Sequence, residues 1–186
     1  LQEGDEERLL EGATFLRQVE MQDAYYDTAG KSLTTKDTWL RFRNGGWEMK
    51  TPLSPSGKLN RVADQYHELT EEKDIAAYLQ LSDGRSLTDR LRQAGYSEFA
   101  HFTSTRRKYS LDDFVIDIDD LDFGYEIAEI ELQVATEAEM ATATERILTL
   151  ARNRNLTVTP VRGKVIEYIL RFDRPHYDRL VEAGVI

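Results

Sequence analysis

Short segments in which charged and apolar residues alternate constrain the fold of this chain more than any other feature. Asp117 and Asp119 alternate with Ile116 and Ile118, and successive side chains of a β-strand point to opposite faces. The same alternation recurs in three further segments, 39–43, 47–51 and 129–132. We therefore expect at least four strands that carry charge on one face and apolar side chains on the other.

Turn and capping signals divide the rest of the chain into further elements. Expected strands cover 14–26, 38–43, 47–51, 61–69, 99–109, 114–119 and 125–134, with Asn44-Gly45-Gly46 as a hairpin turn. Expected helices cover 5–11, a segment starting at 70, 86–94, 136–153 and 175–182, while 164–172 fits a strand or a helix. Strands with attached helices indicate an α+β fold with a mainly antiparallel sheet, formed by one domain over residues 1–186.

The charged faces have two interpretations. They could be the solvated outer face of an ordinary half-buried sheet. However, charge is segregated by strand, because acids pair on two strands and arginines on another. The helices also need the apolar face to pack on. If the sheet closes into a barrel, the charged face lines an interior that can hold water and a ligand.

The chemistry of such an interior points to phosphate. Clustered carboxylates repel one another unless a cation lies among them, and oxygen ligands suit Mg²⁺ or Mn²⁺. Arginine side chains match the geometry of phosphate oxygens. A metal ion combined with cationic side chains is typical of phosphoryl-transfer sites. The sequence has no GxxxxGK[ST] motif, which excludes a P-loop enzyme.

Composition excludes several other classes. The chain has 34 acidic and 24 basic residues, a net charge of −10, which argues against a general nucleic-acid binder. It has no cysteine, so disulfides, zinc–thiolate sites and cysteine nucleophiles are excluded. No apolar run approaches a membrane span and no signal peptide is visible. We expect a cytoplasmic monomer with no membrane partner.

Taken in order, the strand motifs resemble a known family. The fragments are YYDT, WLRFR, WEMK, QYHEL, STRRK, VIDIDDLDFG, EIAEIEL and GKVIEYI. They are similar to the CYTH superfamily, the triphosphate tunnel metalloenzymes, and most similar to its thiamine triphosphatase branch, from about residue 5 to 180. The resemblance implies an eight-stranded antiparallel β-barrel, the triphosphate tunnel, with helices packed outside. The family's opening strand, Glu-x-Glu-x-Lys, is absent from this sequence, which begins at Leu1, and we expect the natural protein to carry it.

The resemblance also implies the site residues. The residues that fall on triphosphate-binding positions are Arg41, Arg43, Lys50, Arg106 and Lys164, with Glu68 as an added tunnel acid. The acidic residues on the metal side are Asp119, Glu129 and Glu131, with Asp117 added. Tyr25 matches a tyrosine that works with Lys50 to activate water, and Trp39 matches a residue that contacts thiamine.

Simpler roles remain open for some of these residues. Without the resemblance, Trp39 and Tyr25 could be packed core aromatics. Arg107 and Lys108 are expected to be solvated, and Asp120 and Asp122 to be turn residues. The three histidines, His67, His101 and His176, are expected to lie outside the site.

The resulting hypothesis is the hydrolysis of thiamine triphosphate to thiamine diphosphate and phosphate, with Mg²⁺, or alternatively Mn²⁺, as cofactor. One alternative is an inorganic tripolyphosphatase, which needs the same cations but no head-group contact. An adenylyl cyclase or an RNA triphosphatase can be built on the same fold. A non-catalytic binder of polyphosphate or a nucleotide is the alternative outside the enzymes.

Overall fold

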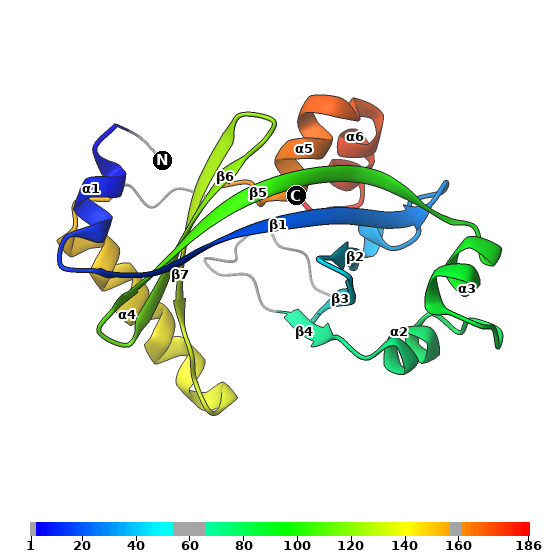
Figure 1. Ribbon diagram of the computed structural model, residues 1–186, viewed down its shortest axis with the longest axis horizontal. Coiled ribbons are helices and arrows are strands. Elements are labelled where there is room, and N and C mark those ends of the chain that lie inside the picture. Colours follow the sequence, from blue (N-terminus) through cyan, green and yellow to red (C-terminus); the bar gives the residue numbers. More distant parts are fainter. Residues whose placement is uncertain (1–2, 54–65, 157–160) are drawn as a thin grey trace. The chain divides into compact units, whose positions relative to one another are not determined.

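A seven-stranded β-sheet is the central element of the fold (Figure 1). The structure is a computed structural model that describes residues 3–53, 66–156 and 161–186. The strands are β1 (Thr14–Thr28), β2 (Trp39–Arg43), β3 (Gly46–Pro52), β4 (Tyr66–Leu69), β5 (Tyr96–Leu111), β6 (Phe114–Leu121) and β7 (Tyr125–Leu132). Their order is β4-β3-β2-β1-β5-β6-β7. The pairs β1–β2, β2–β3, β3–β4, β5–β6 and β6–β7 are antiparallel. The expected α+β class and antiparallel sheet are confirmed, and the described residues form seven strands where an eight-stranded barrel was expected.

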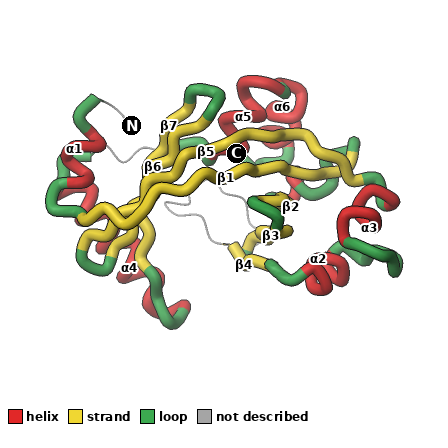
Figure 2. Tube along the Cα trace, in the orientation of Figure 1, coloured by secondary structure: helices red, strands yellow, loops and turns green. Residues whose placement is uncertain are grey.

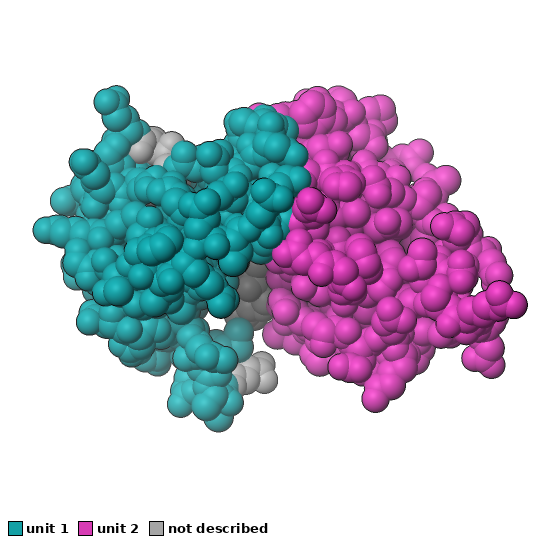
Figure 3. Space-filling model, viewed as in Figure 1, with its two compact units in different colours: residues 1–21, 103–164 teal, residues 22–102, 165–186 magenta. Residues whose placement is uncertain are grey.

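The chain divides into two compact units, each made of two separate stretches of sequence (Figure 3). Unit 1 contains residues 1–21 and 103–164, and unit 2 contains residues 22–102 and 165–186. Strands β1 and β5 each contribute one part to unit 1 and the other part to unit 2. We describe each unit by itself.

In unit 1 the apolar face of the sheet packs against α1 (Asp5–Leu10). Leu9 of this helix is 1% exposed, and it shares a core cluster with Ile116 and Ile118, which are fully buried. The helix α4 (Met140–Asn153) contacts β7 and is preceded by the 3-10 turn η2 (Glu137–Glu139). Strand β6 therefore places its isoleucines in the core, and the intervening aspartates lie on the opposite face.

In unit 2 the hairpin β2–β3 packs its apolar face against α2 (Glu72–Tyr78) and α3 (Leu87–Gln93). Asn44 and Gly45 both have positive φ, 47° and 91°, as a tight two-residue hairpin turn requires. The turn sets the register, which pairs Arg43 with Gly46 and Leu40 with Met49. Leu40 and Met49 are 1% and 0% exposed, so the charged residues that alternate with them along β2 and β3 lie on the other face.

The C-terminal segment forms two helices, α5 (Lys164–Phe172) and α6 (Arg174–Glu182), drawn in red in Figure 2. The ambiguous segment 164–172 is thus a helix, and it buries Ile166 and Ile169, which lie three residues apart. Within the described residues, none of the helices has the length and apolar character needed to cross a membrane.

Several element boundaries differ from those expected. The helix expected from residue 70 begins at Glu72, with Glu71 in the cap position. The helix expected over 136–153 begins only at Met140, after the turn η2. Strand β4 is described only from Tyr66, and the earlier part of the expected strand 61–69 lies outside the described residues.

Candidate active site

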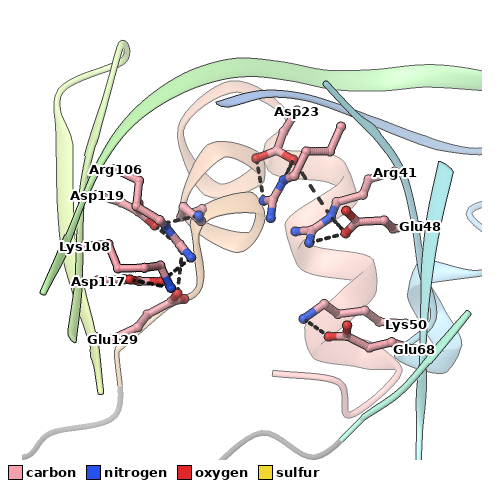
Figure 4. A network of polar contacts seen from close by, with 12 residues as sticks. Asp23, Arg41, Glu48, Lys50, Glu68, Arg106, Lys108, Asp117, Asp119 and Glu129 are labelled. Atoms are coloured by element: carbon pink, nitrogen blue, oxygen red, sulfur yellow. Dashed lines mark hydrogen bonds and ion pairs between the residues drawn. The ribbon is translucent and has the colours of Figure 1, made fainter. Parts of the chain in front are cut away.

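In unit 1, Arg106 lies at the centre of a group of carboxylates on the charged face of β5, β6 and β7 (Figure 4). Its Nε and Nη2 donate to the two carboxylate oxygens of Asp119, each over 2.7 Å. Arg106 Nη2 also donates to Glu129 over 2.9 Å, and Nη1 donates to Asp117. The strand register explains this arrangement, since Arg106 pairs directly with Asp119, and Asp117 pairs with Glu129.

Two lysines complete this group. Lys164, the first residue of α5 and 8% exposed, places Nζ 2.7 Å from Oδ2 of Asp119. Lys108 places Nζ 3.0 Å from Oδ1 of Asp117. The expectation that Lys108 is solvated was wrong, because its side chain is only 21% exposed and pairs with the buried Asp117. It lies two residues from Arg106 and so on the same strand face. Arg107, on the other face, instead pairs with Glu6 of α1.

The cations keep a buried carboxylate ionised. Asp117 and Asp119 are 0% exposed. Burial alone raises the pKa of Asp119, but hydrogen bonds and charge from Arg106 and Lys164 outweigh it and lower the pKa below its ordinary value. Asp119 is therefore negative at neutral pH even though solvent does not reach it.

Three acidic side chains of unit 1 could hold a metal ion. Asp117, Glu129 and Glu131 can each bring one carboxylate oxygen within 4.8 Å of the others. Asp117 Oδ1 is buried and makes no hydrogen bond, although Lys108 is close to it. A set of carboxylate oxygens fits a hard cation such as Mg²⁺ or Mn²⁺. The fourth predicted acid, Asp119, lies outside this set of three and pairs with Arg106 and Lys164.

In unit 2, two arginines of β2 are held by carboxylates of the neighbouring strands (Figure 4). Arg43 donates from Nε and Nη2 to the two oxygens of Asp23, over 2.6 and 2.8 Å. Arg41 donates from Nε to Glu48 over 2.8 Å, and its Nε lies 3.9 Å from Asp23. Asp23 is 0% exposed, and this one buried carboxylate lies close to both arginines.

Lys50 and Glu68 form the next pair along this face. They are cross-strand neighbours in β3 and β4, and the ion pair joins Nζ to Oε1 over 2.8 Å. The hydrogen bond from Lys50 is the main reason that the pKa of Glu68 is lowered, and burial opposes it. Lys50 is directly opposite Trp39 on its other side.

Both predicted aromatic site residues are buried. Tyr25 is 5% exposed, its ring stacks on Phe102 at 5.8 Å between centroids, and Arg41 Nη1 donates to its hydroxyl over 3.4 Å. Trp39 is 6% exposed and donates its indole N–H to Asp37 over 3.0 Å. Each aromatic ring thus has core-like packing together with a polar contact.

Sequence reasoning missed four charged residues on these faces. They are Asp23, Asp37, Glu48 and Lys108. Three of them could have been found from alternation, since each lies two residues from a predicted site residue on the same strand. Asp37 precedes its strand in a turn, so alternation does not reach it.

The predicted site residues therefore fall into two groups by unit. Unit 1 brings together Arg106, Lys164, Asp117, Asp119, Glu129 and Glu131. Unit 2 contains Tyr25, Trp39, Arg41, Arg43, Lys50 and Glu68. Both groups suit the binding of phosphate oxygens through charge-assisted hydrogen bonds.

Comparison with known proteins agrees with this chemistry. A family model described as the CYTH domain matches residues 2–158. The chain belongs to the CYTH family. This CYTH chain is 36% identical over 199 residues to the thiamine-triphosphatase of Homo sapiens, covering 97% of this chain and 86% of that protein. The resemblance inferred from the strand motifs is confirmed.

Solved structures show the same fold. The PH1819 protein of Pyrococcus horikoshii OT3 matches with a TM-score of 0.65 and 21% identity, over 92% of this chain and 94% of that one. A putative adenylate cyclase from Vibrio parahaemolyticus matches with a TM-score of 0.61 and 20% identity, over 91% and 92%. At this identity the likeness concerns the CYTH fold, and fold alone does not decide the substrate.

Proposed function

We propose that this protein hydrolyses thiamine triphosphate to thiamine diphosphate and phosphate with the help of Mg²⁺. The observation that carries the proposal is the 36% identity to human thiamine-triphosphatase over nearly the whole chain. The cationic and acidic groups described above supply the residue types that the reaction needs. The proposal that the protein acts in the cytoplasm as a monomer stays a prediction.

Binding of the triphosphate is assigned to the cationic side chains. In unit 2 these are Arg41, Arg43 and Lys50, and in unit 1 they are Arg106 and Lys164. Guanidinium and ammonium groups hold phosphate oxygens through charge-assisted hydrogen bonds and offset the charge that develops on phosphoryl transfer. Burial of these groups strengthens the interactions, because water competes less for them.

The metal ion is assigned to Glu129, Glu131 and Asp117, with Asp119 as a further acid beside them. When bound, Mg²⁺ would neutralise phosphate charge and polarise the phosphoryl group. The carboxylates of this chain would hold the ion, and Arg106 and Lys108 offset the repulsion between them.

The attacking water is assigned to Tyr25 together with Lys50. The ring of Tyr25 is fixed by its stacking on Phe102, which in turn contacts Tyr168 at 5.6 Å between centroids. A hydroxyl held by a packed ring can orient a water molecule without losing further side-chain freedom.

The test is phosphate release by the protein in the presence of Mg²⁺, with thiamine triphosphate, tripolyphosphate and ATP compared at equal concentrations. We expect the highest kcat/KM for thiamine triphosphate and loss of activity on chelation of Mg²⁺. Equal or higher activity on tripolyphosphate would reject the thiamine-specific function. Absence of phosphate release from all three substrates would reject triphosphate hydrolysis.

An inorganic tripolyphosphatase is the second candidate, and the burial of Trp39 favours it. At 6% exposure the indole presents little surface to an organic head group. A tripolyphosphatase needs no such surface. Trp39→Ala would leave tripolyphosphate hydrolysis largely intact and would lower activity only on a substrate with a head group.

A further inference from the structure

Lys108 lies in one row with two of the three acidic residues that could hold a metal ion. Strand pairing places Lys108 of β5 directly opposite Asp117 of β6, and Asp117 directly opposite Glu129 of β7. Residues that face each other across neighbouring antiparallel strands carry their side chains on the same side of the sheet. The ammonium of Lys108 therefore lies beside Asp117, with Nζ 3.0 Å from Oδ1 (Figure 4).

The oxygen of Asp117 that faces Lys108 is also the one that a metal ion can take. Oδ2 already accepts a hydrogen bond from Nη1 of Arg106. Oδ1 is buried and accepts no hydrogen bond from the described residues, so it interacts with Lys108 through charge. Such an oxygen can become a metal ligand without first losing a hydrogen bond. Because an ammonium group and a metal ion repel each other, the two cations compete for Oδ1.

Of the two cations at Asp117, Lys108 is the one that can move away. Arg106 binds Asp119 and Glu129 as well, so its guanidinium group is held by three carboxylates. Lys108 is paired with Asp117 alone among the described residues, and its side chain is 21% exposed. A lysine ammonium also has a flexible stem, whereas a guanidinium group is planar and rigid. Displacement of Lys108 thus breaks one ion pair and leaves the contacts of Arg106 in place.

The charge balance of the group gives the same result. The group has four carboxylates and three cationic side chains, which are Asp117, Asp119, Glu129, Glu131, Arg106, Lys108 and Lys164. With all of them ionised, a divalent ion changes an excess of negative charge into an excess of positive charge. The group with the ion becomes neutral only if the charge of Lys108 is withdrawn from it. An anion such as phosphate can accept that charge.

We propose that Lys108 competes with the metal ion for Asp117 and, once displaced, binds the phosphate groups of the substrate. This inference rests on the proposed function and gives a role to a residue that was expected to be solvated. In the free protein Lys108 neutralises Asp117. When a metal ion is bound, the ammonium turns from Asp117 to the phosphate oxygens and donates charge-assisted hydrogen bonds to them.

The first test measures metal binding without turnover. Mn²⁺ is titrated into the free protein and followed by electron paramagnetic resonance, and the wild type is compared with Lys108→Met and Lys108→Arg. Methionine is unbranched and uncharged, so we expect Lys108→Met to bind Mn²⁺ about tenfold more tightly. Lys108→Arg keeps the charge and should bind Mn²⁺ like the wild type. An unchanged Mn²⁺ affinity in Lys108→Met, or no Mn²⁺ binding by either protein, would overturn the proposal.

Two further variants show whether the effect depends on Asp117. Lys73→Met removes the same charge from an exposed position of α2 and should leave the Mn²⁺ affinity unchanged, which controls for the net charge of the chain. In the Asp117→Asn protein the contested carboxylate is absent, so the addition of Lys108→Met should give no gain in affinity. A gain of the same size in that background would contradict competition at Asp117. Circular dichroism of each variant reports whether the protein is folded.

The second test measures the role of the displaced ammonium. At saturating Mg²⁺ we expect Lys108→Met to raise the KM for thiamine triphosphate about three- to tenfold, because one cation that binds phosphate is lost. Tighter metal binding together with weaker substrate binding is not what a general loss of structure produces. Tighter Mn²⁺ binding with an unchanged KM would show that Lys108 does not bind the phosphates. If the wild-type protein releases no phosphate, the proposed function fails, while the Mn²⁺ titration still decides the competition.

Discussion

At the scale of single residues, the cations of both units are already paired with carboxylates. Asp23 is the most buried of the partners in unit 2, with Arg43 bound to both of its oxygens. Glu48, which binds Arg41, has a side chain that is 29% exposed. Each of the two carboxylates binds an arginine, but one is buried and the other is partly exposed to water. Their removal should therefore have different consequences.

We predict that Asp23→Ala lowers the free energy of unfolding by about 3–5 kcal/mol, because it leaves two partly buried guanidinium groups without their shared partner. The kcat/KM of this variant for thiamine triphosphate should fall about 10- to 100-fold, since Arg43 loses its fixed orientation and Arg41 loses a neighbouring charge. Urea unfolding and steady-state kinetics measure the two effects. Glu48→Gln is the control and should lower stability by less than about 1 kcal/mol. Equal losses for the two variants would contradict the role given to burial.

We predict that the double variant Glu129→Gln, Glu131→Gln raises the Mg²⁺ concentration needed for half-maximal activity at least about tenfold, because two carboxylate ligands are lost. Binding of Mn²⁺ measured by electron paramagnetic resonance should weaken in parallel. Glu126→Gln is the control, since Glu126 is exposed and its side chain points to the other face of β7. Full Mg²⁺-dependent turnover by the double variant would show that the metal assignment is wrong.

At the scale of elements, alternation on the strands made much of the site predictable. Strand β6 places Ile116 and Ile118 in the core and Asp117 and Asp119 on the charged face, as expected from spacing alone. The same rule, applied to β1 and β5, would also have identified Asp23 and Lys108. Strand pairing then brings residues such as Arg106 and Glu129 together, and pairing depends on partners far away in the sequence.

Turns and helix ends were less predictable, because their contacts are not periodic. Asp37, for example, ends the 3-10 turn η1 (Thr34–Lys36) in the left-handed conformation and accepts a hydrogen bond from Tyr66. The segment 164–172 fits a strand or a helix locally, and the burial of Ile166 and Ile169 accompanies the helix. His176 was expected to lie outside the site, and its partner, Thr34, is 142 residues away.

The contact between α6 and η1 contains a buried neutral histidine. The hydroxyl of Thr34 donates to Asp27 over 2.8 Å, so His176 Nε2–H donates to Thr34, also over 2.8 Å. Burial, and then the charge of Lys31, lower the pKa of His176 from 6.5 to about 4. Asp173 and Asp27 oppose this shift, and Arg179 adds to it.

We predict that stability decreases as the pH falls from about 6.5 to about 4, because in this range the unfolded chain binds a proton at His176 that the folded protein does not. This residue contributes up to about 1.4 kcal/mol per pH unit. In His176→Gln the amide can still donate to Thr34 but does not titrate, so the slope should become shallower. Thr34→Val should lower stability without changing the slope. Urea unfolding at several pH values measures both, and an unchanged slope in His176→Gln would contradict this account.

At the scale of the whole molecule, neither unit is a continuous piece of chain. The backbone passes from one unit to the other after residues 21, 102 and 164. Strands β1 and β5 belong to both units, so loss of either strand removes part of each core. This connectivity supports the prediction of one domain over residues 1–186, which an unfolding experiment can test.

We predict that both units unfold in one cooperative transition. The two tryptophans of the chain, Trp39 and Trp47, both lie in unit 2, so their fluorescence reports on unit 2, whereas far-ultraviolet circular dichroism reports on both units. Ile118→Ala empties part of the unit 1 core and should cost about 2–5 kcal/mol. The fluorescence midpoint should shift together with the dichroism midpoint. A fluorescence midpoint that stays at the wild-type value would show that the units unfold separately.

Because the cations are already paired with carboxylates, an anion that binds to them must displace those carboxylates. Arg41, Arg43 and Lys50 carry Glu48, Asp23 and Glu68 as built-in counterions. An incoming anion gains only the difference between its own contacts and those it displaces. Selectivity should therefore rise steeply with valence, so that inhibition constants fall more from diphosphate to tripolyphosphate than from phosphate to diphosphate. Equal steps in a competition assay would contradict this. A product that carries one phosphate fewer than the substrate therefore binds much less tightly. The carboxylates pair with the cations again and displace this product from the site.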